Sequence, residues 1–233
     1  MGVLKSIGLF VAIVLAILAF PLLTMNGGEG QRKQSNEGLP WQIEILPEGN
    51  SRVFGLIPGS STLADAQVRF GSDVQVAMII APGENGTVEA YYEKVDAGFV
   101  TGKMVITLVS SPAQRQQMLQ RARKAEYMDS STRRIELSDE DLAVARQLPL
   151  LGIGFIPSVN LETDIVIQRF GVPAERIRSS EHIEHFLYPE KGLVLQLDAK
   201  GKELLQYVAP REFAQLRDPL KSPAAINAAQ PLP

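Results

Sequence analysis

The sequence predicts an α+β protein with an N-terminal transmembrane helix followed by two tandem modules, each a helix plus an antiparallel β-meander. Three observations lead to this prediction. Residues 7–23 are an unbroken run of uncharged, mostly apolar residues. The stretches 57–71 and 156–171 resemble each other, and each is followed by short runs in which apolar and polar residues alternate. These patterns are typical of a membrane span, a repeated helix and half-buried strands.

The apolar run reads IGLFVAIVLAILAFPLL. Extended to Met25 as a helix, it would be about 28 Å long, close to the ~30 Å hydrocarbon core of a bilayer. A cleaved signal peptide is the alternative, but its apolar core usually has about 7–15 residues and ends in a small-residue cleavage pattern, which does not follow here. Lys5 precedes the run closely, which favours the N-terminus inside. We therefore predict a single-pass protein of the inner (cytoplasmic) membrane, anchored by residues 7–25, with its soluble region in the periplasm.

The remaining chain divides by composition. A polar, Gly-rich stretch after the apolar run predicts a flexible linker, and a final stretch of prolines and alanines predicts a disordered tail. The expected order is the anchor at 1–25, the linker at 26–40, a first α+β module at 41–110, a helical connector at 111–150, a second α+β module at 151–217 and the tail at 218–233.

The two similar stretches both begin with Ile-Pro and end with Arg-Phe-Gly. Ser61 or Thr62 in the first copy, and Asn160 in the second, belong to the residue types that cap helix N-termini. Gly71 and Gly171 fit the position after a helix end, where a positive φ suits a residue without Cβ. Each copy therefore predicts one short helix.

Three strand-like runs follow each predicted helix. After Gly71 they are VQVAMII, TVEAYY and MVITLV; after Gly171 they are HIEHFLY, GLVLQL and ELLQYV. Glycine- or proline-containing turns separate most of them, which is typical of antiparallel meanders. Two more strands could form at Gln42–Leu46 and Val53–Leu56.

The predicted connector contains two helix starts, at Ser111 and Ser138. Residues 115–134 carry six basic and two acidic side chains. A basic helix here could touch anionic lipid headgroups or an acidic partner. A solvated connecting helix is the alternative, because the apolar stripe on this helix is thin.

The second module carries short motifs that resemble a known family. They are FGVP at 170–173, YP at 188–189, GL at 192–193 and DAKG at 198–201. They resemble the BamE (SmpA/OmlA) family of outer-membrane assembly lipoproteins, and also the tandem-module β-lactamase inhibitor proteins, whose repeats are helices packed on an antiparallel sheet. The similarity covers residues 153–210 and, more faintly, 53–109. The chain differs from BamE in having no cysteine to carry a lipid. The resemblance implies a non-enzymatic, exported, protein-binding fold.

Composition and motifs argue against several function classes. With 26 acidic and 23 basic side chains, the chain lacks the basic excess that nucleic-acid binding requires. It has no cysteine for a thiolate metal site or a cysteine nucleophile. His182 and His185 lie three residues apart on a predicted strand, so their imidazoles would face opposite ways. No nucleophile elbow or phosphate-binding loop occurs. We therefore predict no enzyme, no cofactor and no metal.

Aligning residues 88–92 of the first predicted module with residues 183–187 of the second indicates a candidate contact surface. Alternation places Val88, Ala90 and Tyr92 on the more apolar face, with Ile183, His185 and Leu187, and we assign this face to a helix-covered core. The opposite face would then present aromatic side chains flanked by carboxylates, as protein-binding surfaces do. Packing of these aromatics across a module interface is the alternative. The predicted partner-binding residues are Glu89, Tyr91, Glu93, Glu184, Phe186 and Tyr188.

These observations predict a membrane-anchored, extracytoplasmic protein-binding module without catalytic activity, which acts in envelope assembly or enzyme inhibition. Its partner would be another envelope protein. We expect Tyr91→Ala and Phe186→Ala to leave folding nearly intact while weakening partner binding. A structural or sensory element that binds cell wall, lipid or a small ligand is the second candidate. A membrane-tethered hydrolase that uses carboxylates with His182 or His185 is the third.

Overall fold

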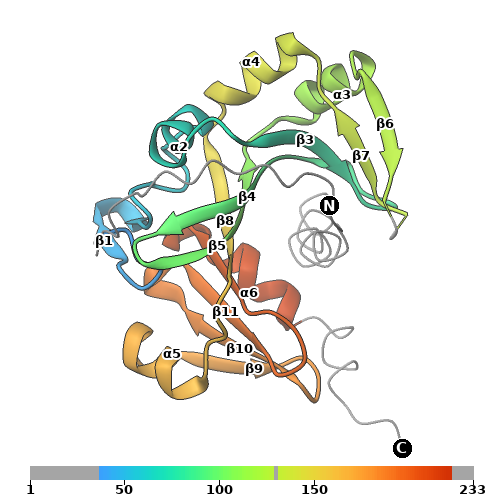
Figure 1. Cartoon of the computed structure of the whole chain (residues 1–233). Helices are drawn as coiled ribbons and strands as arrows, with labels where there is room; N and C mark the ends of the chain where they lie inside the picture. Colours follow the sequence, from blue (N-terminus) through green and yellow to red (C-terminus); the bar gives the residue numbers. More distant parts are fainter. Residues whose placement is uncertain (1–36, 129–130, 222–233) are drawn as a thin grey trace, which may run out of the picture.

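The computed structural model describes residues 37–128 and 131–221 (Figure 1). Within them, ten strands form one antiparallel sheet in the order β6-β7-β3-β4-β5-β8-β12-β11-β10-β9, and a separate ribbon pairs β1 with β2. The main sheet comprises β3 (Gln75–Ile80), β4 (Thr87–Ala97), β5 (Val100–Leu108), β6 (Lys124–Tyr127), β7 (Arg133–Glu136), β8 (Leu150–Pro157), β9 (Glu175–Arg178), β10 (Ile183–Tyr188), β11 (Leu193–Asp198) and β12 (Leu204–Val208).

Short helices and turns connect the strands. The ribbon consists of β1 (Glu44–Leu46) and β2 (Asn50–Arg52). The α-helices are α2 (Leu63–Phe70), α3 (Pro112–Gln120), α4 (Asp139–Gln147), α5 (Thr163–Phe170) and α6 (Ala214–Leu220). Three single 3₁₀ turns are η1 (Pro47–Gly49), η2 (Pro189–Lys191) and η3 (Pro210–Glu212). Figure 1 shows α2, α3 and α4 on one side of strands β3 to β5.

The two similar sequence stretches form α2 and α5, which have the same length and the same ending. Thr62 starts α2 in a capping box with Asp65, as the threonine alternative predicts. α5 instead starts after Glu162, whose side chain makes no cap hydrogen bond, so the predicted cap Asn160 is wrong. Gly71 ends α2 with φ 97° and ψ 170°, and Gly171 ends α5 with φ 85° and ψ −178°. This backbone region is essentially restricted to glycine.

We predict that Gly71→Ala lowers the free energy of unfolding by about 1–2 kcal/mol, because alanine is strained at this φ and ψ. A Cβ on Gly71 meets nothing within 4 Å, so the loss of stability would come from the backbone conformation alone and not from a steric clash. Urea denaturation measures the change. Val68→Ala is the control, since Val68 is 90% exposed on the same helix and its replacement should change stability by less than about 0.5 kcal/mol. Equal effects of the two substitutions would contradict the prediction.

The predicted fold class of two tandem modules behind a transmembrane helix is wrong. The two meanders belong to one sheet, because β8 pairs with β5 on one side and with β12 on the other. The buried residues on one face of this sheet form a single cluster that runs from Leu39 to Tyr207 and includes side chains of both halves. Phe54 lies at its centre, with its ring centroid 5.3 Å from those of Phe155 and Tyr207. The sequence echo therefore marks a repeated helix ending within one sheet and one main core.

The connector predicted as helical contains the hairpin β6–β7 between α3 and α4, and β7 extends the sheet beside β3. Ser111 and Ser138 are the N-caps of the two helices, as predicted. The basic side chains of this segment are largely paired with acidic ones. Arg121 Nε donates to the buried Asp141 carboxylate at 3.2 Å, and Arg123 pairs with Asp139. These pairs favour a structural role for the basic residues over binding of anionic lipid.

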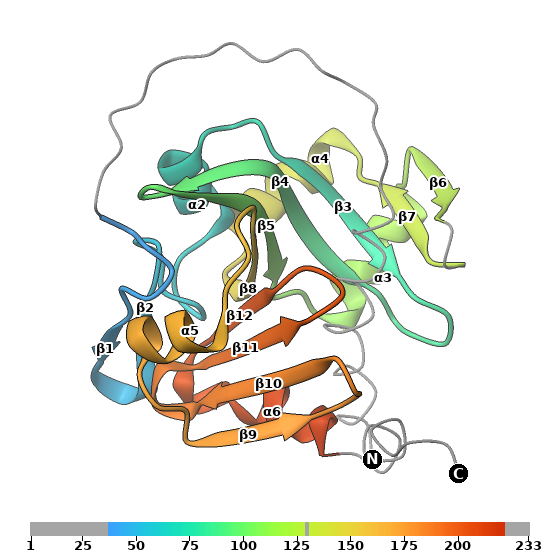
Figure 2. The same cartoon turned by 60° about the horizontal axis from the view of Figure 1, so that its bottom comes forward.

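The second half of the sheet is covered on both faces. Leu216 and Leu220 of α6, with Phe213 just before the helix, pack against Leu187, Val194 and Val208. Figure 2 shows α6 behind strands β9 to β12. The opposite face of the same strands contributes to the main core. The predicted tail begins at residue 218, inside α6; residues 222–233 lie outside the described part of the chain.

No helix within residues 37–128 and 131–221 combines the length and apolar character needed to cross a membrane. This finding contradicts the prediction of a single-pass inner-membrane protein with a transmembrane helix. The anchor predicted at residues 7–25 itself lies outside the described residues. At the end of the predicted linker, Leu39 and Pro40 are buried, so the folded part begins before residue 41.

Candidate partner-binding surface

Of the residues predicted for partner binding in the second half of the sheet, Phe186 and Tyr188 lie in the core and Glu184 is half-buried. Phe186 is 0% exposed, and the Arg176 guanidinium covers its ring at 4.5 Å from the centroid. Glu184 holds that guanidinium through two hydrogen bonds of 3.0 and 2.8 Å. The predicted free face is therefore wrong here, because the sequence alternation cannot reveal that α6 covers one face while the other packs on the main core.

Tyr188 also has a structural position. Its side chain is buried, and its hydroxyl donates to the Gly171 carbonyl oxygen at 3.0 Å, at the end of α5. Lys191 donates to the neighbouring Phe170 carbonyl oxygen. Both bonds satisfy carbonyl groups that the helix end leaves without an intrahelical partner. Tyr188 thus fixes α5 against the sheet.

In the first half of the sheet, Val88, Ala90 and Tyr92 face the main core, as the alternation predicts. On the reverse face, Tyr91 is half-buried and its hydroxyl donates to the exposed Glu93 carboxylate. Lys103 lies 2.8 Å from the other oxygen of that carboxylate. These two predicted residues are accessible, but their polar groups are already paired.

Glu89, the sixth predicted residue, is buried on the same reverse face. Its carboxylate accepts from the Thr87 hydroxyl at 2.7 Å. Burial raises the pKa of Glu89 to about 7, because an ionised carboxylate is poorly solvated there; the Thr87 hydrogen bond lowers it in part. Near neutral pH this side chain is present in both protonation states.

Further buried polar side chains lie on this reverse face. Glu89 pairs across the sheet with Thr107, and Thr107 with Gly152. Gln206 lies beside Gly154, on the same side as Glu89. His185 lies further along this face, on β10. All four polar side chains are buried, and Gln206 Nε2 has no hydrogen-bond partner among the residues that the structure describes. The reverse face is thus polar at its centre, in contrast to the apolar main core.

An aromatic cluster surrounds Trp41, which is half-buried and is the only tryptophan of the chain. Its ring lies 5.9 Å from that of Phe99 and 6.2 Å, edge-on, from that of Phe170. The Arg169 guanidinium lies over the indole at 5.0 Å from the ring centroid, a cation–π geometry. We call Trp41, Phe99, Ile165 and Arg169 the Trp41 surface.

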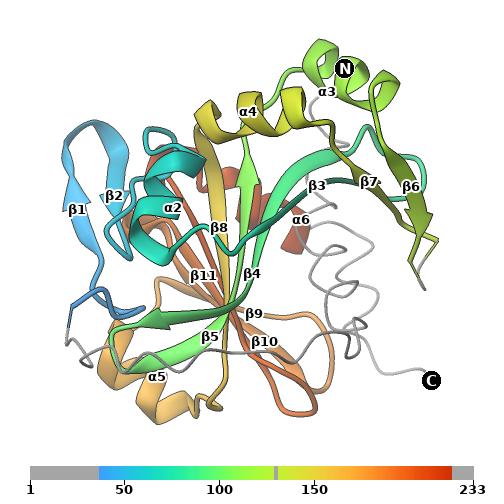
Figure 3. The same cartoon turned by 45° about the horizontal axis from the view of Figure 1, so that its top comes forward.

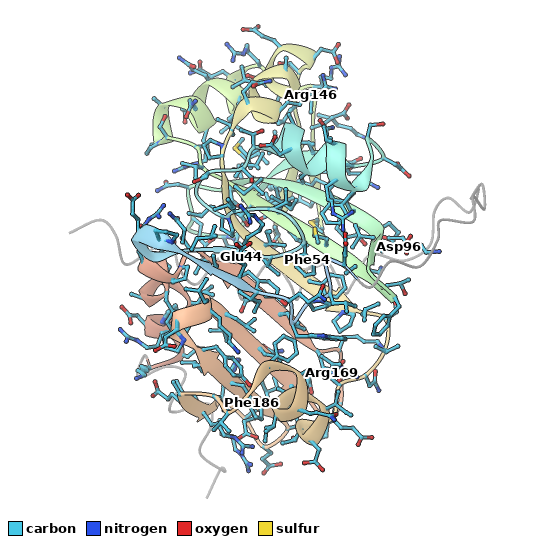
Figure 4. The ribbon with its side chains drawn as sticks, turned by 90° about the vertical axis from the view of Figure 1, so that its left-hand side faces the viewer. Glu44, Phe54, Asp96, Arg146, Arg169 and Phe186 are labelled. Carbon is cyan, nitrogen blue, oxygen red and sulfur yellow. The ribbon has the colours of Figure 1, made fainter. Side chains whose placement is uncertain are left out.

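The members of the Trp41 surface come from three structural contexts. Phe99 lies at the tip of the β4–β5 hairpin, next to Gly98 with φ 66°, and is 47% exposed. Ile165 and Arg169 are four residues apart on α5 and therefore share one helix face. Ile165 is 42% exposed and Arg169 is exposed. Figure 4 faces this side of the molecule and labels Arg169.

A fixed turn positions Trp41 itself. Gln42 N–H donates to the Leu39 carbonyl oxygen at 3.0 Å, and the Gln42 side chain accepts from Leu39 N–H at 3.0 Å. The buried Tyr207 hydroxyl donates to the Pro40 carbonyl oxygen at 2.9 Å. Trp41 therefore directly follows Leu39 and Pro40, which are buried, and its backbone is fixed by the turn, so little ordering is required when a partner binds.

Arg169 keeps its hydrogen-bonding capacity for a partner. Within residues 37–128 and 131–221 no carboxylate pairs with it, and stacking on Trp41 leaves the edges of the guanidinium open. Guanidinium N–H groups bind carboxylates in a bidentate manner. The Trp41 surface thus offers exposed apolar side chains beside one unpaired cation.

Sequence reasoning missed the Trp41 surface, since its members are far apart in the chain. Trp41 lies at a predicted module start, and Phe99 in a predicted turn. Two features could have indicated it: the chain has a single tryptophan, and Ile165 and Arg169 have helical i, i+4 spacing. Nothing in the sequence indicates that the hairpin tip and α5 both lie beside Trp41.

The two histidines have no metal-binding arrangement in the described part of the chain. His185 is buried, its Nε2 lies 2.8 Å from the Ser179 hydroxyl, and its Nδ1 has no hydrogen-bond partner within residues 37–128 and 131–221. His182 Nε2 lies 4.0 Å from the Asp198 carboxylate. No group of three histidine, aspartate or glutamate side chains within the described residues could hold a metal ion. Burial lowers the pKa of His185 to about 4, so this imidazole is neutral at physiological pH.

Comparison with known proteins gives no relative: no family model matches the chain, and neither a curated protein nor a solved structure does. The resemblance to the BamE family therefore stays a prediction.

Proposed function

We propose that this chain is a non-catalytic protein-binding module and that the Trp41 surface is its contact site. The observation that carries the proposal is the cluster of the half-buried Trp41 with the exposed Phe99 and Arg169, on a pre-fixed turn, a hairpin tip and a helix end. Tryptophan and arginine dominate the binding energy of protein–protein interfaces, especially where rigid elements present them.

The chemistry of the surface defines the complementary partner segment. An apolar partner side chain would pack on Trp41 between Phe99 and Ile165, and a partner carboxylate would pair with Arg169. Burying the guanidinium of Arg169 with a carboxylate in a partly apolar contact strengthens their attraction relative to water. We therefore infer that the bound segment carries an apolar residue close to an acidic one. This proposal replaces the predicted sheet face, whose Phe186 and Tyr188 are buried.

Site-specific photocrosslinking in cells tests the proposal. A photoreactive residue at position 99 is expected to trap a discrete partner, whereas one at position 68, exposed on α2, is not. Arg169→Glu should abolish the product formed at position 99. The matched control is Arg146→Glu, since Arg146 is an exposed arginine on α4, at the opposite end of the molecule from Arg169 (Figure 4). Equal trapping at positions 99 and 68, or equal loss in both arginine variants, would refute the proposal.

With the trapped partner purified, we predict that Trp41→Ala weakens its binding by about 2 kcal/mol or more, roughly thirty-fold. Calorimetric titration measures the dissociation constant. Because Trp41 also packs on Phe170, thermal unfolding of each variant shows whether the fold is intact. Arg169→Lys keeps the charge but loses the bidentate geometry, so an intermediate loss is expected. Unchanged affinity in Trp41→Ala would exclude the surface as the binding site.

A further inference from the structure

The strand β6 forms one edge of the main sheet, which is separate from the Trp41 surface. Among the described residues, β6 pairs only with β7, and all four residues of β6 are exposed. Figure 3 shows β6 at the outer margin of the sheet, beyond β7. An exposed sheet edge offers unpaired N–H and C=O groups to another strand.

The register shows which backbone groups of β6 are free. Met128 N–H donates to the Thr132 carbonyl oxygen at 2.8 Å, in the same register that pairs Glu126 with Arg134. Hydrogen-bonded pairs alternate along an antiparallel ladder, so Glu126 bonds to β7 and Ala125 does not. The N–H and C=O groups of Ala125 and Tyr127 therefore point away from the sheet.

The side chains of β6 complement a second copy of the same strand. In a two-fold antiparallel pairing centred on Ala125, each Ala125 exchanges two hydrogen bonds with its counterpart. The Lys124 side chain of each copy then lies opposite Glu126 of the other copy, so two such pairs form on one face of the sheet. Opposite charges in directly facing positions stabilise a strand pair. Shifting the centre to residue 126 would instead place Glu126 opposite Glu126, which is destabilising.

The other edge of the sheet lacks this self-complementarity. β9 has the sequence ERIR, and Ser179 N–H donates to the Ile183 carbonyl oxygen at 3.1 Å. By the same alternation, the backbone groups of Arg176 and Arg178 point outward. A two-fold pairing at this edge would place arginine opposite arginine. Charge of this kind protects an edge from pairing.

We propose that two copies of this chain associate through β6, in antiparallel register centred on Ala125, so that the two sheets become continuous. In each chain alone, Lys124 forms an ion pair with Glu126 on its own strand. In the dimer each carboxylate also faces the lysine of the other copy. Because the shared strand is short, the interface is small and the dimer is weak and concentration-dependent.

A cysteine trap tests the contact directly, because the chain has no cysteine. Facing residues of a hydrogen-bonded antiparallel pair have Cα atoms about 5.5 Å apart, within disulfide range. Ala125→Cys is therefore expected to form a disulfide-linked dimer under mild oxidation. Arg178→Cys, on the opposite edge, is the control and should stay largely monomeric. Crosslinking no faster at 125 than at 178 would overturn the proposal, as would an unmodified chain that sedimentation shows to be monomeric at all concentrations up to about 1 mM.

Charge exchange tests the register. Lys124→Glu places two acidic side chains opposite each other at two positions, so it should weaken dimerisation roughly tenfold or more in sedimentation equilibrium. The double variant Lys124→Glu/Glu126→Lys restores opposite charges at both positions and should recover the dimer. Recovery of the dimer in the double variant supports the register. A dimer dissociation constant that is the same in both variants and in the unmodified chain contradicts it. Thermal unfolding of each variant monitors the fold.

Discussion

Phe186→Ala is expected to lower the free energy of unfolding by about 3–5 kcal/mol, because it removes a fully buried aromatic ring and leaves a cavity. This outcome is the opposite of what the sequence alone predicts, namely a folded protein with a weakened partner contact. The Arg176 guanidinium would also lose the ring that it covers at 4.5 Å. Chemical denaturation followed by circular dichroism measures the change.

Tyr91→Ala serves as the comparison on the other half of the sheet. Tyr91 is half-buried, and its hydroxyl bonds to the exposed Glu93, so we expect a much smaller loss of stability. Phe186→Leu retains most of the buried apolar volume, so its loss of stability reports the change of side-chain shape. The additional loss in Phe186→Ala then reports the cavity. If Phe186→Ala were no more destabilising than Tyr91→Ala, the placement of Phe186 in the core would be wrong.

Glu89→Gln should stabilise the protein at pH 8 by about 3 kcal/mol and change little at pH 4.5. The folded-state pKa of Glu89 is raised from 4.5 to about 7. Between these values the folded protein holds a proton that the unfolded chain releases, so wild-type stability falls as the pH rises from 4.5 to 7 and stays reduced above. A shift of this size corresponds to about 3 kcal/mol. Glutamine is neutral throughout and can still accept the Thr87 hydrogen bond.

Urea denaturation of wild type and Glu89→Gln across pH 4 to 8 measures this difference. His185 supplies the opposing dependence: its pKa is lowered from 6.5 to about 4, so stability falls as the pH drops through that window. The two effects offset each other between about pH 4.5 and 6.5 in the wild type. His185→Gln should remove the acid-side dependence. A Glu89→Gln gain that is the same at pH 4.5 and pH 8 would refute the raised pKa.

Local sequence patterns predicted local structure well. The helix that ends at Gly71 follows from its capping residues and from glycine at a position only glycine tolerates. The inward face of β4 follows from simple alternation, because one side of that strand meets α2 and the main core. In both cases the deciding interactions lie within a few residues of each other in the chain.

The errors arose where distant segments decide the structure. α6 covers β10 from a stretch that looks like a tail, so both faces of β10 are buried and alternation cannot assign one to solvent. β8 reads L-G-I-G-F, and its two glycines weaken the strand pattern although it lies at the centre of the sheet. The Trp41 surface joins a turn, a hairpin tip and a helix end, and no local pattern encodes their proximity.

The central position of β8 has a consequence during synthesis. β5 leaves the ribosome long before β8, which follows only after the α3–β6–β7–α4 segment. Synthesis adds about 5–20 residues per second, so the edge of β5 that will pair with β8 stays unpaired for a few seconds. A nascent chain paused in this interval exposes an apolar strand with one unpaired edge. We expect a chaperone that shields extended apolar segments to bind the chain here and to leave once residues 150–157 emerge.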